Sequence, residues 1–437
     1  MHNSYLEINK SLPLSGTVSL MGAKNAVLVI MASLLLTRGK SILHNVPCSS
    51  DVLHMIILLQ ELGARVIFDT EHKTLHVDTS FVCSYKVSPE IMGKMRASIL
   101  VMGPLLAQFK KAEIALPGGC VIGARPIDLH LFGFEKMGAV MAQQEGFLCA
   151  QVLEFKESKI VLDYPSVGAT ENIMMAALAV PGLTRIVNAA LEPEVLDLIQ
   201  VLTKMGAEIK ILPPATIEII GGSPLMPIEH TIIMDRLEAG TLLLAAAITG
   251  GTINLPDAPA FVMEAVIAKL EQMGHIVIIG EGGQGISLMA TNSPQAVSFK
   301  TGPYPAFPTD LQAPMMALQC FSQGVSVVTE TVFENRFGHV KELQKMGAQI
   351  VVEHNTATIT GVDQLQGSSV VATDIRASCA LMLAGLVAQG TTVMTGISHW
   401  RRGYDNLEHK LALLGAAITM RSLPYVLNER KEIQKVS

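Results

Sequence analysis

The stretch LLQELGARV, residues 58–66, decides the fold because its pattern returns five more times along the chain. In each copy an amphipathic segment ends in Gly and continues into β-branched residues. The six glycines are Gly63, Gly138, Gly206, Gly274, Gly347 and Gly415. The interval of about 70 residues marks an internal repeat. A glycine in this place fits the position after a helix C-terminus, where a left-handed residue leads into a strand. The sequence therefore predicts six repeated units.

A second series of segments lies out of phase with the first. These segments are apolar nearly all round, which is typical of buried helices. They begin near Lys24, Arg96, Gly168, Glu238, Asp310 and Arg376. Short β-rich stretches follow them, such as SILHNV at 41–46 and TTVMTG at 391–396. Each unit is predicted to contain a buried helix, a strand, an amphipathic helix and one or two further strands.

Six units of this size favour two α/β domains of three units each. Residues 224–235, PLMPIEHTIIMD, interrupt the repeat with two prolines and suggest a boundary near residue 230. We expect residues 21–231 to form one domain, and residues 1–20 with 232–437 to form the other. In this arrangement the chain crosses between the domains twice, and a cleft lies between them.

Composition excludes several classes of protein. The 437 residues are 49% hydrophobic and only 16% charged, which argues against a disordered chain or a long coiled coil. A net charge of −6 argues against a general nucleic-acid scaffold. The longest apolar runs, 26–36 and 241–248, are too short to span a membrane, and the N-terminus lacks a secretion signal. The six cysteines form no CxxC pair and the histidines no HExxH motif, which favours reduced thiols in the cytosol and argues against a metal enzyme.

The segment LPGGCVIGARPID, residues 116–128, is the most unusual local sequence. Its glycines permit close backbone approach, and Arg125 lies five positions after Cys120. A thiol near a cation can act as nucleophile or proton donor. The alternative is that Cys120 is a small buried residue, as lone cysteines often are. Asp128 is expected to cap the helix that follows.

Cations stand at the start of three buried helices, at Lys24, Arg96 and Arg376. A cation there opposes the helix dipole by a few tenths of a kcal/mol. An anionic ligand would compensate, because helix N-termini favour anions. Asp310 begins another of these helices, where it has two interpretations: an N-cap or a functional carboxylate.

Two more arginine-containing segments are candidates for the same anion site. FENRFGHV places Arg336 early in an expected amphipathic helix, and Arg401 and Arg402 precede Gly403. An arginine beside glycine in a loop suits bidentate contact with phosphate or carboxylate. Each of these arginines can also be an ordinary surface charge. Cations repeated at structural positions of an acidic protein point to a small, strongly anionic substrate.

Taken together, these segments resemble one family, the UDP-N-acetylglucosamine 1-carboxyvinyltransferases. The resemblance covers residues from about 5 to about 420. It rests on GAKNA, MRAS, LPGGCVIGARPIDLH, SVGATEN, FPTDLQAP, TETVFENRFGHV, DIRAS and RGYD, in this order. It implies an inside-out α/β barrel fold, with two domains of three units and helix N-termini directed at the cleft. The implied reaction moves the enolpyruvyl group of phosphoenolpyruvate to the 3-hydroxyl of UDP-N-acetylglucosamine and releases phosphate, the first committed step of peptidoglycan precursor synthesis.

The resemblance also implies roles for the residues that react. Cys120 would protonate the methylene carbon of phosphoenolpyruvate, and it can form a covalent adduct with that substrate or with the drug fosfomycin. Asp310 would take the proton from the sugar hydroxyl. The cations that would hold phosphate and carboxylate are Lys24, Arg125 and Arg402. No metal or organic cofactor is implied, and the location would be cytoplasmic.

Further residues would position the substrates. Asn25, Arg96 and Arg376 would orient sugar and phosphoenolpyruvate. Val332 would contact the sugar nucleotide, and Glu192 is a further cleft candidate. The residues implied for the UDP site are Arg125, Pro126, Ile127, Asp128, Leu129, Ser166, Val167 and Gly168.

The chain departs from this family at several points. Cys48 and Ser50 stand where relatives often carry lysines, and Tyr164 stands where a lysine is common. Pro165 follows Tyr164, so the contact with uridine or pyrophosphate can differ. Residues beyond about 420 extend past the usual end of the family, and the sequence gives them no role.

Three alternatives remain at this stage. The sister enzyme that acts on shikimate 3-phosphate shares the fold, although the cysteine loop and SVGAT speak against it. A non-catalytic paralogue would not need Cys120 and Asp310 together. A structural repeat scaffold would give no reason for cations at the starts of buried helices.

Overall fold

The repeat glycines hold the turn between helix and strand in the computed structural model, which describes residues 4–115 and 127–422. All six adopt the left-handed backbone that the pattern predicts, with φ between +94° and +109°. Within the described residues the six units build six four-stranded sheets. Each unit contains the predicted buried helix, strand, amphipathic helix and further strands.

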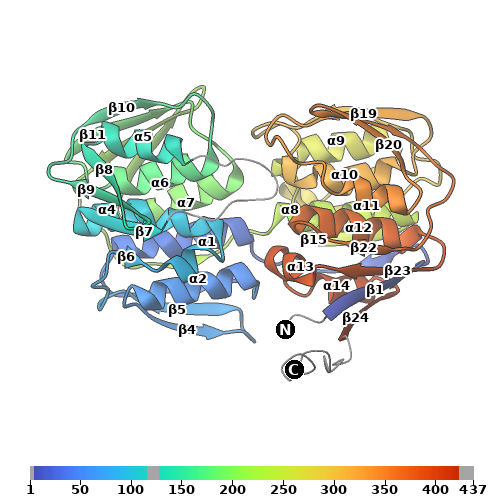
Figure 1. Ribbon diagram of the computed structural model, residues 1–437, viewed down its shortest axis with the longest axis horizontal. Helices are drawn as coiled ribbons and strands as arrows, with labels where there is room; N and C mark the ends of the chain where they lie inside the picture. Colours follow the sequence, from blue (N-terminus) through green and yellow to red (C-terminus); the bar gives the residue numbers. More distant parts are fainter. Residues whose placement is uncertain (1–3, 116–126, 423–437) are drawn as a thin grey trace, which may run out of the picture.

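Three units form the first body, drawn in blue to green in Figure 1. The first unit contains α1 (Lys24–Ser33), η1 (Leu34–Leu36), β3 (Lys40–His44), α2 (Ser50–Glu61), β4 (Arg65–Asp69) and β5 (Thr74–Asp78). The second contains β6 (Lys86–Val87), α3 (Pro89–Met92), η2 (Arg96–Val101), α4 (Met102–Phe109), β7 (Lys111–Ala115), α5 (Asp128–Lys136), β8 (Ala139–Gln144) and β9 (Phe147–Val152). The third contains β10 (Ser158–Val161), α6 (Val167–Ala177), β11 (Gly182–Val187), α7 (Pro193–Lys204), β12 (Glu208–Leu212) and β13 (Thr216–Gly221).

The other three units form the second body, drawn in yellow to red (Figure 1). The fourth unit contains α8 (Arg236–Thr249), β15 (Thr252–Pro259), η3 (Ala260–Val262), α9 (Glu264–Gln272), β16 (Ile276–Ile279), η4 (Glu281–Gly283) and β17 (Gln284–Met289). The fifth contains β18 (Phe299–Lys300), η5 (Thr309–Leu311), α10 (Gln312–Gln319), β19 (Val325–Thr329), α11 (Val340–Lys345), β20 (Gln349–Glu353) and β21 (Thr356–Thr360). The sixth contains β22 (Ser369–Val371), α12 (Ile375–Val387), β23 (Thr391–Thr395), α13 (Ile397–Gly403), α14 (Leu407–Leu413) and β24 (Ile418–Ser422).

Two terminal segments complete sheets that are distant in sequence. β1 (Ser4–Asn9) lies between β23 and β24, so a blue strand runs among red ones in Figure 1. β2 (Ser15–Thr17) pairs with β15, and β14 (Glu229–Thr231) pairs with β3. The chain therefore passes between the two bodies twice. The two crossings run side by side, since Ala23 N donates to Ile233 O at 2.7 Å. The domain limits 20/21 and 231/232 stay a prediction.

The apolar helices lie inside and the sheets outside, which is the inside-out arrangement. In the second body α8, α10 and α12 pack against one another. Each body has its own core of buried apolar residues, one spanning 23–232 and the other 6–20 with 237–418. In α1 every residue except Asn25 is buried. Burial of each large aliphatic side chain contributes about 1.5–3 kcal/mol, so these helices carry much of the stability. No helix among the described residues has the length and apolar character to cross a membrane.

Candidate active site

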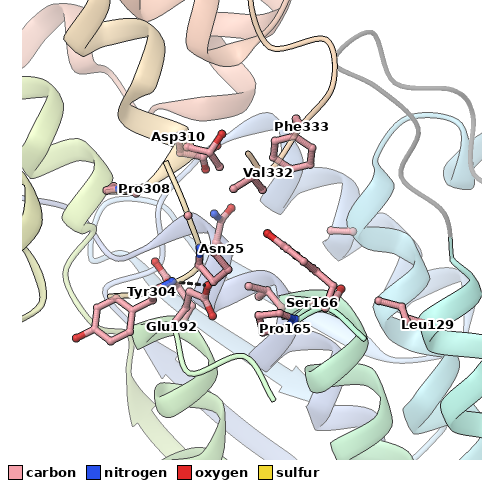
Figure 2. Close-up of a pocket in the computed structure, with 18 of the residues that line it drawn as sticks. Asn25, Leu129, Pro165, Ser166, Glu192, Tyr304, Pro308, Asp310, Val332 and Phe333 are labelled. Atoms are coloured by element: carbon pink, nitrogen blue, oxygen red, sulfur yellow. Dashed lines mark hydrogen bonds between the residues drawn. The ribbon is translucent and has the colours of Figure 1, made fainter. Parts of the chain in front are cut away.

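A pocket of about 720 Å³ opens between the two bodies. Figure 2 shows Asp310, Val332 and Phe333 on one side of it, and Leu129, Pro165 and Ser166 on the other. Of the predicted site residues that the structure describes, ten line it: Asn25, Ile127, Asp128, Leu129, Ser166, Val167, Gly168, Glu192, Asp310 and Val332. Segments more than 300 residues apart in sequence (from 25 to 332) thus meet in one cavity.

Helix N-termini form much of the pocket wall. Asn25 is the second residue of α1, Asp128 the first of α5 and Val167 the first of α6. Ser166 caps α6, because its side chain accepts a hydrogen bond from Ala169 N at 3.3 Å. Asp128 lies in the first turn of α5 and makes no side-chain capping bond, so the capping prediction for it is wrong. Three positive helix ends directed at one cavity favour an anionic ligand.

Asp310 lies at the wall that belongs to the second body, between two arginines. Arg376 Nη2 donates to its Oδ2 at 2.7 Å, and Arg336 Nη2 donates to its Oδ1 at 2.5 Å. Burial by itself raises the pKa of this carboxyl, but Arg376 and Arg336 outweigh it and hold the pKa well below the usual range. The side chain remains 26% exposed toward the pocket. The alternative that Asp310 is an N-cap is wrong, since η5 has no side-chain cap.

Arg336, a sequence candidate for the anion site to which the resemblance gave no role, lies beside the site through its contact with Asp310. The expectation of a helical position is wrong, because Arg336 lies in the turn of residues 334–339 that precedes α11. It is 4% exposed, and its guanidinium lies 5.0 Å from the ring centre of Phe333. The turn brings the guanidinium of Arg336 to Asp310. Helical periodicity would not have predicted this position for the guanidinium.

Arg376 is the second residue of α12, and Asp374 caps this helix by accepting from the backbone nitrogens of Arg376 and Ala377. Its guanidinium is held from behind by Tyr404, whose hydroxyl accepts from Nη1 at 3.3 Å. Burial lowers the pKa of a guanidinium, but Asp310 raises that of Arg376 above its ordinary value, so it stays charged. This supports a fixed ion pair with Asp310 beside the pocket.

Lys24 and Arg402 lie outside the pocket wall, although both are held by one carboxylate. Lys24 Nζ is 3.3 Å from Asp51 Oδ2, and Arg402 Nε is 2.9 Å from Asp51 Oδ1. The predicted need for an external anion at the helix starts is therefore met in part by the chain itself. Asp51 forms an ion pair with Lys24, and Asp310 forms one with Arg376. Sequence reasoning missed Asp51, because nothing in the spacing of 27 and 351 residues indicates these contacts.

Glu192 precedes α7 and contacts the opposite body. Its Oε1 accepts from Tyr304 N at 3.3 Å, which is the dashed line in Figure 2. Burial raises the pKa of this carboxyl. Within the described residues, its other oxygen is buried without a hydrogen-bond partner. Close by, Glu194 forms a bidentate ion pair with Arg236 of the second body, at 3.1 and 3.2 Å.

The positions that depart from the family also have defined places. Tyr164 and Pro165 line the pocket, and burial, followed by Glu192 and Glu330, raises the pKa of the Tyr164 phenol. Cys48 N donates to Asp405 Oδ2 at 2.9 Å, and Ser50 begins α2. The pocket therefore presents an aromatic ring at the position where the resemblance led us to expect a lysine.

The structure does not describe the side chains of four predicted site residues. Cys120, Arg125 and Pro126 lie outside the described residues, and Arg96 begins η2 with its side chain outside the description. Their assigned roles stay predictions.

This chain is similar in sequence and in fold to known proteins. Residues 8–411 match the family described as EPSP synthase (3-phosphoshikimate 1-carboxyvinyltransferase). The chain belongs to this family of carboxyvinyl transferases. Two solved structures share its fold: the enolpyruvyl transferase NikO from Streptomyces tendae and an EPSP synthase from Acinetobacter baumannii. NikO gives a TM-score of 0.87 at 23% identity and covers 97% of this chain and 100% of its own. The EPSP synthase gives 0.74 at 16% identity and covers 96% and 100%.

The sequence relatives are more specific. UDP-N-acetylglucosamine 1-carboxyvinyltransferase 1 of Caldanaerobacter subterraneus subsp. tengcongensis is 49% identical, across 94% of this chain and 98% of its own length. The UDP-N-acetylglucosamine 1-carboxyvinyltransferase of Dichelobacter nodosus is 46% identical, across 93% and 96%. These names confirm the resemblance drawn from the eight sequence segments, and the solved structures confirm the predicted fold.

Proposed function

We propose that this protein transfers the enolpyruvyl group of phosphoenolpyruvate to the 3-hydroxyl of UDP-N-acetylglucosamine and releases phosphate. This reaction begins peptidoglycan precursor synthesis. The names of the two relatives support the substrates. The observation that carries the chemistry is Asp310, an ionised carboxylate fixed by two arginines at the edge of a pocket with three helix N-termini.

The proposed reaction has two steps, addition and elimination. Asp310 takes the proton of the sugar hydroxyl, and the hydroxyl oxygen of the sugar forms a bond to the central carbon of phosphoenolpyruvate. The electron pair of the double bond accepts a proton at the methylene carbon, donated by the Cys120 thiol. This gives a tetrahedral ketal. In the elimination the methyl carbon returns a proton to the Cys120 thiolate and the bond to phosphate breaks. This restores the carbon–carbon double bond of the enolpyruvyl group, which is now attached to the sugar oxygen, and releases phosphate.

The surrounding side chains would bind and orient the substrates. Lys24, Arg125 and Arg402 would hold the phosphate and carboxylate, whose charges they offset. Asn25, Arg96 and Arg376 would orient the reacting groups. The UDP moiety would lie along the starts of α5 and α6, with Val332 and Glu192 on the far side. These steps use side chains without a metal or an organic cofactor. A cytoplasmic location suits the thiol that the reaction needs.

The first test is phosphate release from phosphoenolpyruvate, with and without UDP-N-acetylglucosamine. Wild type should release phosphate only with both substrates, and Asp310→Ala should lose about 10²–10⁴-fold in kcat. Glu281→Ala removes an exposed carboxylate that does not line the pocket and serves as the control. Release stimulated by shikimate 3-phosphate instead would support the sister enzyme. No release, with the UDP-sugar still bound, would support a non-catalytic paralogue.

The role of Cys120 can be tested with fosfomycin. We expect the drug to inactivate the protein in the presence of the UDP-sugar and to add one molecule to Cys120, as peptide mass spectrometry would show. Cys120→Asp should stay active and become resistant. The control Cys83→Ser changes an exposed thiol and should leave sensitivity unchanged. An unmodified Cys120 at saturating drug would contradict the assignment, and a Cys120→Asp variant without turnover would show that the thiol cannot be replaced by an acid.

A further inference from the structure

Asp51 is a buried carboxylate that joins cations from both bodies. Its side chain is 4% exposed, whereas those of Lys24 and Arg402 are 11% and 31% exposed. One oxygen contacts Lys24 of the first body at 3.3 Å, and the other contacts Arg402 of the second at 2.9 Å. The two cations offset the rise that burial causes and lower the pKa of Asp51. The carboxylate is therefore charged at neutral pH.

The local backbone fixes the position of Asp51. Ser49 caps α2 by accepting from Val52 N at 3.4 Å, so Asp51 lies in the first turn, where the helix dipole favours a negative charge. Lys24 begins α1 of the same body, and Arg402 lies in the last turn of α13. The position of Asp51 is thus fixed by its helix, and two long, flexible cationic side chains form ion pairs with it.

A second carboxylate between the bodies has a different set of contacts. Asp405 accepts from Lys73 Nζ at 3.1 Å and from Cys48 N at 2.9 Å. It too is buried, with 7% exposed. Among the described contacts it reaches neither Lys24 nor Arg402. Asp405 therefore joins the same two bodies without touching a cation assigned to the substrate.

We propose that Asp51 is a positioning residue for phosphoenolpyruvate, because it gathers Lys24 and Arg402 onto one carboxylate so that their charges converge on the substrate. The inference rests on the proposed function, which assigns these two cations to the phosphate and carboxylate. Lysine and arginine side chains lose much rotamer freedom when they bind a ligand, and prior ordering reduces that loss.

The negative charge of Asp51 also repels the anionic substrate. Its removal, however, leaves the nearly buried ammonium of Lys24 without its carboxylate. It also frees the part-exposed guanidinium of Arg402 to turn into solvent. The two cations then no longer meet the substrate from fixed positions, and this loss exceeds the relief of repulsion.

The test compares Asp51→Asn with Asp405→Asn, each of which neutralises one carboxylate between the bodies. Steady-state phosphate release and calorimetric titration of phosphoenolpyruvate into the UDP-sugar complex are the measurements. For Asp51→Asn we expect the KM and Kd for phosphoenolpyruvate to rise at least tenfold, and the KM for UDP-N-acetylglucosamine to stay within twofold. For Asp405→Asn we expect both KM values to stay within threefold. Asp51→Glu keeps the charge but moves it, and should raise the KM for phosphoenolpyruvate by an intermediate factor of at least threefold.

Several outcomes would overturn the proposal. One is an unchanged or lower KM for phosphoenolpyruvate in Asp51→Asn. Another is an equal loss in Asp51→Asn and Asp405→Asn, which would mean that Asp51 only joins the two bodies. If Asp51→Asn does not fold, as thermal unfolding would show, Asp51→Glu carries the test, and a wild-type KM in that variant would refute the role. Failure of the proposed function is distinguishable, because wild type would then release no phosphate with both substrates present.

Discussion

At the scale of residues, Asp310 in the pocket wall and Asp51 outside it are carboxylates that each bind two cations. Asp310 has two guanidinium partners, and Asp51 has one ammonium and one guanidinium. Each carboxylate compensates a cation at the start of a buried helix, a place that the helix dipole makes unfavourable. The same cations keep both carboxylates ionised, which a general base at Asp310 requires.

Glu171 gives the opposite case and a prediction about pH. It is 4% exposed in α6, and burial, reinforced by Glu194 and Glu192, raises its pKa well above the ordinary 4.5. The folded protein thus keeps this proton at a pH where the unfolded chain has lost it. Stability contributed by the protonated form is full below 4.5 and is lost as pH rises through the folded pKa. We expect Glu171→Gln to raise the Tm at about pH 8 and to lose this advantage near pH 5.

Thermal unfolding from about pH 5 to pH 8 checks this, with the exposed Glu281→Gln as control. A difference in Tm between Glu171→Gln and wild type that is the same at every pH would contradict it.

At the scale of elements, the repeated helix–glycine–strand turn is the device that the six units share. Its glycines differ in their surroundings. A Cβ on Gly63 would lie 2.7 Å from Phe81 O, whereas a Cβ on Gly347 would meet no atom of the described residues within 4 Å. Both have positive φ, +105° and +96°. Both glycines therefore need a left-handed backbone, but Gly63 is also crowded by a neighbouring carbonyl, whereas Gly347 has open space around it.

This contrast predicts two different costs for the same substitution. Gly347→Ala should lower the free energy of unfolding by about 1–2 kcal/mol, the cost of a left-handed L-residue. Gly63→Ala should lower it by more, because the carbonyl of Phe81 must also move. Urea unfolding measures both. Equal losses in the two variants would mean that the backbone around Gly63 relaxes freely.

At the scale of the whole molecule, the pocket wall comes from both bodies, which are joined by two adjacent crossings. Asn25, Ser166 and Leu129 belong to one side, and Asp310 and Val332 to the other. A ligand that contacts both sides stabilises the arrangement in which they are closest. The ion pair of Arg236 with Glu194 already links them at one edge.

We therefore expect saturating UDP-N-acetylglucosamine to reduce the radius of gyration measured by small-angle X-ray scattering. An unrelated nucleotide such as ATP, at the same concentration, is the control and should leave the radius unchanged. An identical scattering curve with and without the UDP-sugar, under conditions where calorimetry shows binding, would contradict closure.

The sequence by itself determined the six units and the buried helices. These follow from short-range patterns: a period of about 70 residues, apolar helices and a glycine after each amphipathic segment. Resemblance over eight segments supplied the family and most of the site, including Asn25, Ser166 and Val332.

Only the tertiary structure decided which charges meet. Arg402 and Asp51 are 351 residues apart, and Asp310 and Arg336 are 26 apart across a turn that was expected to be helical. Hydrophobic periodicity reports which face of a local element is buried, and it carries no information about the partner across a domain interface. The Asp310–Arg336 pair depends on how a turn packs within the second body, and the Asp51–Arg402 pair depends on how the two bodies pack. Such pairs are fixed by the tertiary packing of the chain and not by the spacing of residues along it.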